Sequence, residues 1–339
     1  MSAFRPVCVS CGQPVRGEYL QALGGVWHPE HFVCKGCGRP LGSQAFSSHN
    51  GAPYHTECYN QFVAPRCAHC GKPLIGKYFL HNGASFHAEC YRQFVVPHCA
   101  YCSKPLMEGW VTDYWGTKFC TEHQQQYPHC AYCSRLVSPQ QQERGAEIAR
   151  CPICRSSAIE TIEEAKPLYS RVVHWASSQG LTYNNLPLKL ELCDRAKLTH
   201  LSHERNSTHS LGVTRGKTTT TYTQNGPIVH TEVSGVAILQ GLPATLFQGV
   251  TMHELGHVWL IVHGIQGLPP WGEEGFCELL AYHYYQQLNT PEARYHASST
   301  EKNPDPVYGD GFRRVRALAD KHSFPRLLTS LNTKKQLPR

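Results

Sequence analysis

The chain has 339 residues, 41% of them hydrophobic, and a formal net charge of +7. Because this length exceeds what one compact core usually serves, we expect two or more domains. No stretch approaches about 18 uninterrupted apolar residues, which excludes a membrane span and a membrane partner. The first residues, "MSAFRPVCVSCG", lack the basic start and apolar run of a signal peptide, so we expect a cytoplasmic protein.

Cysteines dominate the first half of the chain. Fifteen of the 17 Cys precede residue 155, and one spacing recurs: C-x2-C, sixteen or seventeen residues, then a second Cys or His pair separated by two residues. A C-x2-C knuckle supplies two of the four ligands of a structural zinc ion. The pattern therefore predicts five structural Zn²⁺ sites: Cys8, Cys11, His28 and His31; Cys34, Cys37, His55 and Cys58; Cys67, Cys70, His87 and Cys90; Cys99, Cys102, Cys120 and His123; and Cys130, Cys133, Cys151 and Cys154.

The same Cys pairs also indicate the cellular compartment of the protein and the class of partner that it binds. Disulfides would need an oxidising compartment and an export signal, so zinc thiolates in a reducing cytoplasm fit the sequence better. Five Zn²⁺ ions on fifteen thiolates would lower the formal charge to about +2. A nearly neutral protein with scattered basic residues does not favour nucleic acid, and we expect no nucleic-acid partner.

The zinc modules form a repeat. "ECYNQFVAPRCAHCGKPL" at 57–74 nearly matches "ECYRQFVVPHCAYCSKPL" at 89–106, which predicts small units that need their metal to fold. A two-residue spacer, Phe32 and Val33, separates the first two modules. This arrangement over 1–62 resembles a LIM domain, with His31 where LIM domains usually have Cys. LIM domains mostly bind proteins.

Three LIM-like or zinc-ribbon-like modules are expected over 63–156, and a linking helix over 157–180. Ser156 or Ser157 is the expected N-cap of this helix, and Gly180 its stop.

An α+β domain is expected over 181–330. "LPLKLELCD" at 186–194 alternates apolar and polar residues, and residues 208–240 have the composition of further strands. Strands followed by a helix favour a mostly antiparallel sheet. Residues 331–339 are expected to form a flexible tail.

"VTMHELGHVWL" at 250–260 contains the pattern HExxH. His253 and His257 are four residues apart, so on a helix they share a face and can bind one metal ion, with Glu254 beside them. In a chain with 21 His this pattern alone is weak evidence, because it can arise by chance. A catalytic zinc also needs a third protein ligand and an open fourth position for water.

"WGEEGFCELLAYHYY" at 271–285 predicts a second helix that could supply the third ligand. Glu274, at its start, is separated from His257 by sixteen residues. Glu273 and Glu278 compete with Glu274 for this position.

"HELGH" and "WGEEGF" together resemble the gluzincin clan, in which the Glu before the Gly is the third zinc ligand. With the zinc modules, "GLP" at 241–243 and "DPVYGDGFR" at 305–313, the chain is similar to the ubiquitin-activated LIM-domain peptidases of the DA type, known from plants as regulators of organ size. The resemblance implies a zincin-type, gluzincin-like peptidase domain with an HExxH active-site helix. It also implies cleavage of protein substrates, with ubiquitin or ubiquitinated proteins as candidate partners.

The expected cofactors are one catalytic and five structural Zn²⁺ ions. Glu254 is the predicted general base, because it adjoins His253 without being needed as a ligand. Tyr308 is the candidate donor to the oxyanion, with His283 and Tyr282 as rivals. Asp310 is expected to fix local backbone or to orient a ligand His.

Three further expectations concern the substrate, the remaining thiols and the alternatives. An extended substrate is expected to pair with the strand near Gly235–Leu239, and Cys193 and Cys277 are expected to be core thiols. The main alternative function is a LIM-type interaction scaffold with an idle peptidase domain. A nucleic-acid-binding zinc-ribbon protein is a third class.

Overall fold

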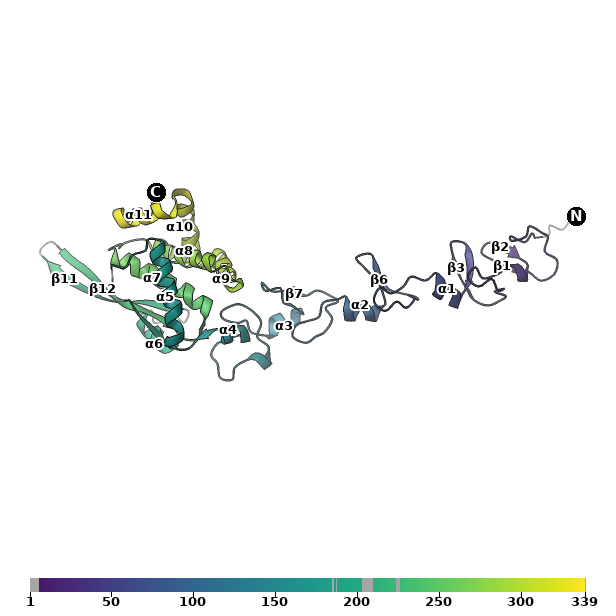
Figure 1. Ribbon diagram of the computed structural model, residues 1–339, viewed down its shortest axis with the longest axis horizontal. Coiled ribbons are helices and arrows are strands. Elements are labelled where there is room, and N and C mark those ends of the chain that lie inside the picture. Colours follow the sequence, from purple (N-terminus) through teal and green to yellow (C-terminus); the bar gives the residue numbers. More distant parts are fainter. Residues whose placement is uncertain (1–5, 185, 187, 203–209, 224–225, 339) are drawn as a thin grey trace. The chain divides into compact units, whose positions relative to one another are not determined.

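The computed structural model describes residues 6–184, 186, 188–202, 210–223 and 226–338 (Figure 1). The chain forms two compact units. One unit extends to Thr112 and includes Thr117–Thr121, and the other contains Asp113–Gly116 and the chain from Glu122 onward. The boundaries expected at 156 and 180 therefore fall inside the second unit.

Short antiparallel hairpins make up the first unit, as expected for zinc modules. They are β1 (Leu20–Ala22) with β2 (Gly25–Trp27), β3 (Phe46–His49) with β4 (Ala52–His55), β5 (Phe79–His81) with β6 (Ala84–Phe86), and β7 (Val111–Thr112) with β8 (Lys118–Phe119). Short helices accompany them: η1 (Pro29–His31), α1 (Thr56–Phe62) and α2 (Ala88–Phe94). In the first two modules Phe32, Cys34 and Leu41 form a small core under Trp27 and Phe46.

The predicted Cys/His quartets come together in the described part of the chain. In each of the five groups, the potential ligand atoms lie within 4.8 Å of one another. All 17 Cys are described, and none forms a disulfide. Burial alone would raise the pKa of the Cys8 thiol, but the backbone N–H groups of His28 and Cys11 outweigh it and lower the pKa to about 5. The knuckle therefore favours the thiolate, which is the form that binds metal.

The second unit includes the last zinc module and, from the fourth, the Asp113–Gly116 loop and the chain from Glu122 onward. It contains α3 (Thr121–Gln126), η2 (Pro139–Gln141), α4 (Pro152–Ser156) and β9 (Ala158–Ile159), followed by α5 (Ile162–Ser178). The N-cap of α5 is Thr161, which forms a capping box with Glu164, and not Ser156 or Ser157. The expected caps were wrong because 158–159 form a strand, so the helix begins later. Gly180, at φ +86°, follows the helix as expected.

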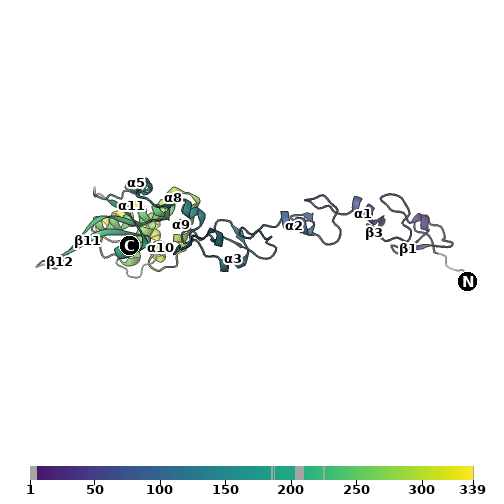
Figure 2. The same cartoon turned by 90° about the horizontal axis from the view of Figure 1, so that it is seen from below.

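A three-stranded mixed sheet follows, in the order β10 (Lys189–Cys193), β12 (Gly226–Leu239), β11 (Gly212–Thr223). The long β11–β12 pair is antiparallel, as expected, whereas β10 pairs with β12 in parallel. Helix α6 (Arg195–Leu201) lies between β10 and β11 in the chain, and β13 (Leu242–Pro243) pairs with β9. The distal end of the β11–β12 hairpin extends beyond the helices (Figure 2).

Five helices complete the second unit: α7 (Ala244–Val262), α8 (Pro270–Leu288), α9 (Pro291–Lys302), α10 (Gly309–His322) and α11 (Phe324–Lys334). Helix α7 packs against β11 and β12 on one side and against α8 on the other. One hydrophobic core joins the last zinc module, α5, the sheet and these helices. Among the described residues, no helix is long and apolar enough to cross a membrane.

The expected tail boundary at 330 falls inside α11. Leu327 and Leu331, one helical turn apart, are fully buried, and Leu337 also packs against the core. This apolar spacing is what extends helix α11 to Lys334.

Candidate active site

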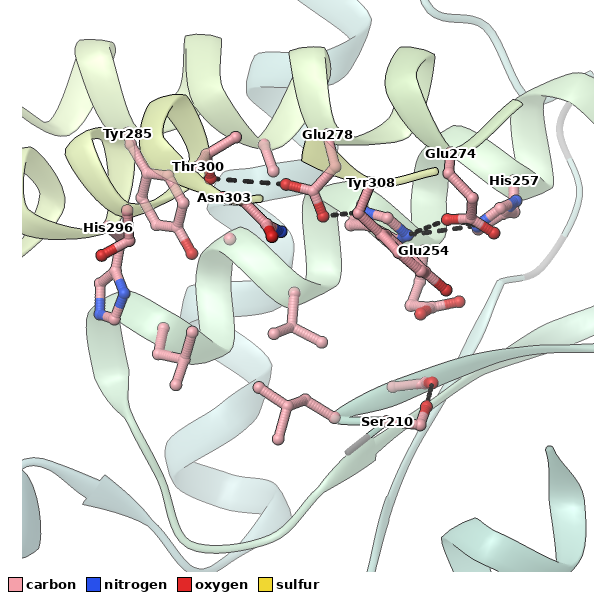
Figure 3. Close-up of a pocket in the computed structure, with 18 of the residues that line it drawn as sticks. Ser210, Glu254, His257, Glu274, Glu278, Tyr285, His296, Thr300, Asn303 and Tyr308 are labelled. Atoms are coloured by element: carbon pink, nitrogen blue, oxygen red, sulfur yellow. Dashed lines mark hydrogen bonds and ion pairs between the residues drawn. The ribbon is translucent and has the colours of Figure 1, made fainter. Parts of the chain in front are cut away.

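Helices α7 and α8 bring three side chains to one point. The Nε2 atoms of His253 and His257 are 3.2 Å apart. The Oε2 atom of Glu274 lies 3.2 Å from the first of these nitrogens and 3.5 Å from the second. The two His share a face of α7 because they are four residues apart, and Glu274 is in the first turns of α8 (Figure 3).

Glycines allow the helices to approach this closely. A Cβ on Gly256 of α7 would lie 2.9 Å from the Cys277 sulfur of α8. A Cβ on Gly275 would lie 2.3 Å from the carbonyl of Gly311 in α10, and one on Gly311 would lie 2.3 Å from the carbonyl of Trp271. The Gly that follows Glu274 is therefore required by helix packing.

Glu273 and Glu278, the two rivals of Glu274, contact the outer nitrogens of the imidazoles. The Nδ1 atom of His253 lies 3.2 Å from Glu278, and that of His257 lies 3.2 Å from Glu273. Glu278 also accepts a hydrogen bond of 3.4 Å from Thr300. Carboxylates on Nδ1 hold the rings with both Nε2 atoms turned toward Glu274.

The ionisable groups of this cluster shift one another's pKa values. Burial would lower the pKa of His253, but its contacts with Glu274 and Glu278 outweigh burial and hold it well above its ordinary value. Burial would raise the pKa of Glu274, but the two imidazoles hold it well below its usual range. The Oε2 atom of Glu274 is buried and has no hydrogen-bond partner among the described residues. A buried anion facing two ring nitrogens without hydrogen-bond geometry fits a shared cation.

Glu254, the predicted general base, is buried beside this cluster. The Thr214 hydroxyl lies 2.9 Å from the Oε2 atom of Glu254 and also 2.9 Å from its backbone carbonyl. On the same strand, a Cβ on Gly212 would lie 2.9 Å from the Glu254 Cγ atom. Strand β11 therefore positions the carboxylate, a role that Thr214 did not reveal in the sequence because it depends on tertiary contact.

A cleft of about 1480 Å³ opens over these residues. Figure 3 shows His257 and Glu274 at one end and Tyr285 and His296 at the other. Tyr308 lines the cleft, and its ring centroid lies 6.3 Å from that of His253.

The rival oxyanion donors do not line this cleft. Tyr282 donates to Glu301 at 2.8 Å, and His283 packs on Phe324. Of the three candidates, Tyr308 is the one that the structure places beside His253.

Asp305, and not Asp310, fixes the backbone before Tyr308. Its carboxylate accepts hydrogen bonds from the backbone N–H groups of Val307 and Tyr308, both at 2.8 Å. Asp310 pairs with Arg313 one turn further along α10. The expectation for Asp310 was wrong because its carboxylate pairs with Arg313 on the same helix.

The expected substrate-pairing strand is the central strand of the sheet. Residues Gly235–Leu239 of β12 pair with β10 on one side, and their other side pairs with β11. Both edges are occupied, so a substrate cannot pair there, and this expectation was wrong. Cys193 and Cys277 are buried, as expected.

Comparisons with known proteins identify relatives of this chain. The LIM domain model matches residues 8–63, and the DA1-like model, described as Protein DA1, matches residues 188–304. Protein DA1-related 1 and Protein DA1 of Arabidopsis thaliana are 26% and 24% identical over 95% and 98% of the chain. LIM domain-containing protein HDR3 of Oryza sativa subsp. japonica is 24% identical over 87% of it.

The chain is similar to DA1-type LIM proteins over most of its length. The resemblance to this family inferred from the sequence is thereby confirmed. The chain spans 64%, 68% and 59% of the lengths of these three relatives. The DA1-like match includes His253, His257 and Glu274, whereas Tyr308 lies outside it.

Proposed function

We propose that this protein is a zinc-dependent endopeptidase whose catalytic ion is held by His253, His257 and Glu274. The supporting observation is the triangle of two Nε2 atoms and one Oε2 atom, with sides of 3.2, 3.2 and 3.5 Å. Ligand atoms about 2.0–2.1 Å from one tetrahedral zinc lie about 3.3 Å apart. Two imidazoles and one carboxylate leave the fourth position open, as in catalytic zinc sites.

The bound metal would supply a water of lowered pKa and would polarise the scissile carbonyl. Glu254 is then the base that takes the proton of the attacking water and passes it to the leaving amine. Thr214 holds the Glu254 carboxylate in place through its hydroxyl. Tyr308, beside His253, would donate to the carbonyl oxygen as it gains negative charge.

The substrate in this proposal is an extended protein segment. Strand β11 pairs with β12 along one edge, and Leu211–Thr214 line the cleft. Main-chain pairing to an exposed strand edge binds many sequences, because it uses groups common to all residues. The β11 edge therefore replaces the β12 edge expected from the sequence.

The zinc modules would recruit the protein substrate in the reducing cytoplasm, with five structural Zn²⁺ ions holding them folded. Ubiquitin or ubiquitinated proteins are the proposed regulatory partners, on the basis of the family resemblance. The alternative is an interaction scaffold with an idle peptidase domain, favoured by the LIM match over residues 8–63.

Cleavage of an unfolded protein, read by mass spectrometry, separates the two functions. Wild type should cut, and Glu254→Gln should not, although metal analysis should find about six zinc ions in both. Because Gln cannot take the proton, a loss of cleavage at unchanged zinc content identifies the base. If neither protein cuts while both retain their zinc, the scaffold is the better account.

A further inference from the structure

The loop at Asp113–Gly116, which joins β7 to β8 in the fourth zinc module, packs within the second unit. The Trp115 ring stacks on Tyr295 of α9 with centroids 5.0 Å apart, and the Arg135 guanidinium lies 3.5 Å from the ring centroid of Trp115. The Trp115 indole N–H donates to the Cys133 carbonyl at 2.8 Å. Tyr295 donates to the Ser134 hydroxyl at 2.7 Å. These contacts hold the loop against α9 and the fifth zinc module.

Tyr114, the neighbour of Trp115, is turned to the cleft instead. It lines the cleft with 51% of its surface exposed, and its ring lies 5.1 Å from Tyr295 at an angle of 76°. Nothing in the mechanism uses this exposed aromatic side chain. Because Trp115 anchors the loop, Tyr114 is a fixed part of the cleft wall.

Helix α7 also contributes to the lining of the cleft. Leu246 lines the cleft and precedes His253 by seven residues on the same helix, a distance of about 10 Å along the axis. An extended peptide covers that distance with about three residues. The nearby His296 ring is uncharged at neutral pH, because burial lowers its pKa to about 4.

We propose that Tyr114, Tyr295 and Leu246 form a subsite for a large apolar side chain of the substrate, about three residues from the scissile bond. The proposal rests on the peptidase function above and adds its sequence preference. Two aromatic rings and a Leu offer apolar contact, and aromatic pairs add to what burial alone contributes. The Asp113–Gly116 loop is thereby part of the substrate-binding surface.

Binding to the uncleaving Glu254→Gln protein tests the subsite directly. Fluorescein-labelled twelve-residue peptides of Ala, Ser and Gln, each with one Phe at a different position, would be titrated and followed by anisotropy. Cleavage of the same peptides by wild type locates the scissile bond. We expect a Phe about three residues from that bond to tighten binding about tenfold.

The same series with Tyr114→Ala added should lose this preference, and Tyr114→Phe should keep it. Tyr78→Ala is the matched control, because Tyr78 is an exposed aromatic of the third module that does not line the cleft. A binding profile without a preferred Phe position, or one that Tyr114→Ala leaves unchanged, overturns the subsite. If wild type cleaves the peptides without any preference for Phe, the subsite is contradicted but the peptidase function is not. If the peptides bind in a Phe-dependent way but are not cleaved, the peptidase function is contradicted but the subsite is not.

Discussion

At the scale of single residues, the placement of Glu254 depends on Thr214. Thr214→Val removes the hydroxyl but keeps the shape of the side chain, so the carboxylate loses its contact at 2.9 Å. We expect kcat to fall about tenfold with little change in KM, because a base out of position slows chemistry more than binding. Thr214→Ser should retain most of the activity. Equal rates for the Val and Ser variants in a peptide assay would contradict the positioning role.

The titration of His296 should make the free energy of unfolding depend on pH. Burial lowers its pKa to about 4, below the value of about 6.5 in an unfolded chain. As pH falls, the unfolded state therefore takes up the proton before the folded state does. The contribution of neutral His296 to the free energy of unfolding is complete above pH 6.5 and is lost as pH falls toward 4.

The matched variant is His296→Phe, which has no titrating ring. Between pH 7.5 and pH 5, the free energy of unfolding of the wild type should fall by up to about 2 kcal/mol more than that of the variant. Urea unfolding of the zinc-loaded proteins at both pH values measures this difference. If the difference between wild type and variant is the same at pH 5 and pH 7.5, His296 is not held neutral by burial.

At the scale of elements, the site depends on how closely α8 packs against α7 and α10. Gly275→Ala would place a Cβ against the backbone of Gly311, which cannot give way as a side chain could. We expect the free energy of unfolding to fall by about 1–3 kcal/mol, with weaker zinc binding at Glu274. Gly272→Ala on the same helix is the control, because its Cβ would meet the flexible end of Leu337 at 3.0 Å and the ring of Pro269 only at 3.3 Å, and no backbone atom as closely. Chemical denaturation of both variants should separate them.

At the scale of the whole molecule, the fifth zinc module belongs to the hydrophobic core of the second unit. Its four Cys are buried in the same hydrophobic cluster as α5, α7 and α8, whereas Cys34 is in a separate small core. Cys133→Ser should therefore destabilise the second unit and lower cleavage of short peptides. Cys34→Ser should leave both unchanged. Hydrogen exchange of the α7 amides checks this, and protection in Cys133→Ser equal to wild type would contradict it.

The sequence by itself determined what depends on local spacing. Five Cys/His quartets follow from a repeated interval, and the shared face of His253 and His257 follows from the helical period. The helix–strand order of the second half and the resemblance to DA-type LIM proteins were also readable, because both reside in short contiguous segments. Helix α5 was predicted to start too early, because the pairing of β9 with the distant β13 decides where it begins.

Only the tertiary structure decided what depends on contacts between distant segments. The position of Glu274, and not of Glu273 or Glu278, beside both Nε2 atoms depends on the packing of α8 on α7, and the contact of Thr214 with Glu254 depends on the position of β11. Because β12 is the central strand, the proposed edge for pairing with the substrate is that of β11. The order of the strands is a property of the assembled sheet and not of a single segment. The burial of Leu331 and the contact of Trp115 with Tyr295 likewise join segments that no local pattern connects.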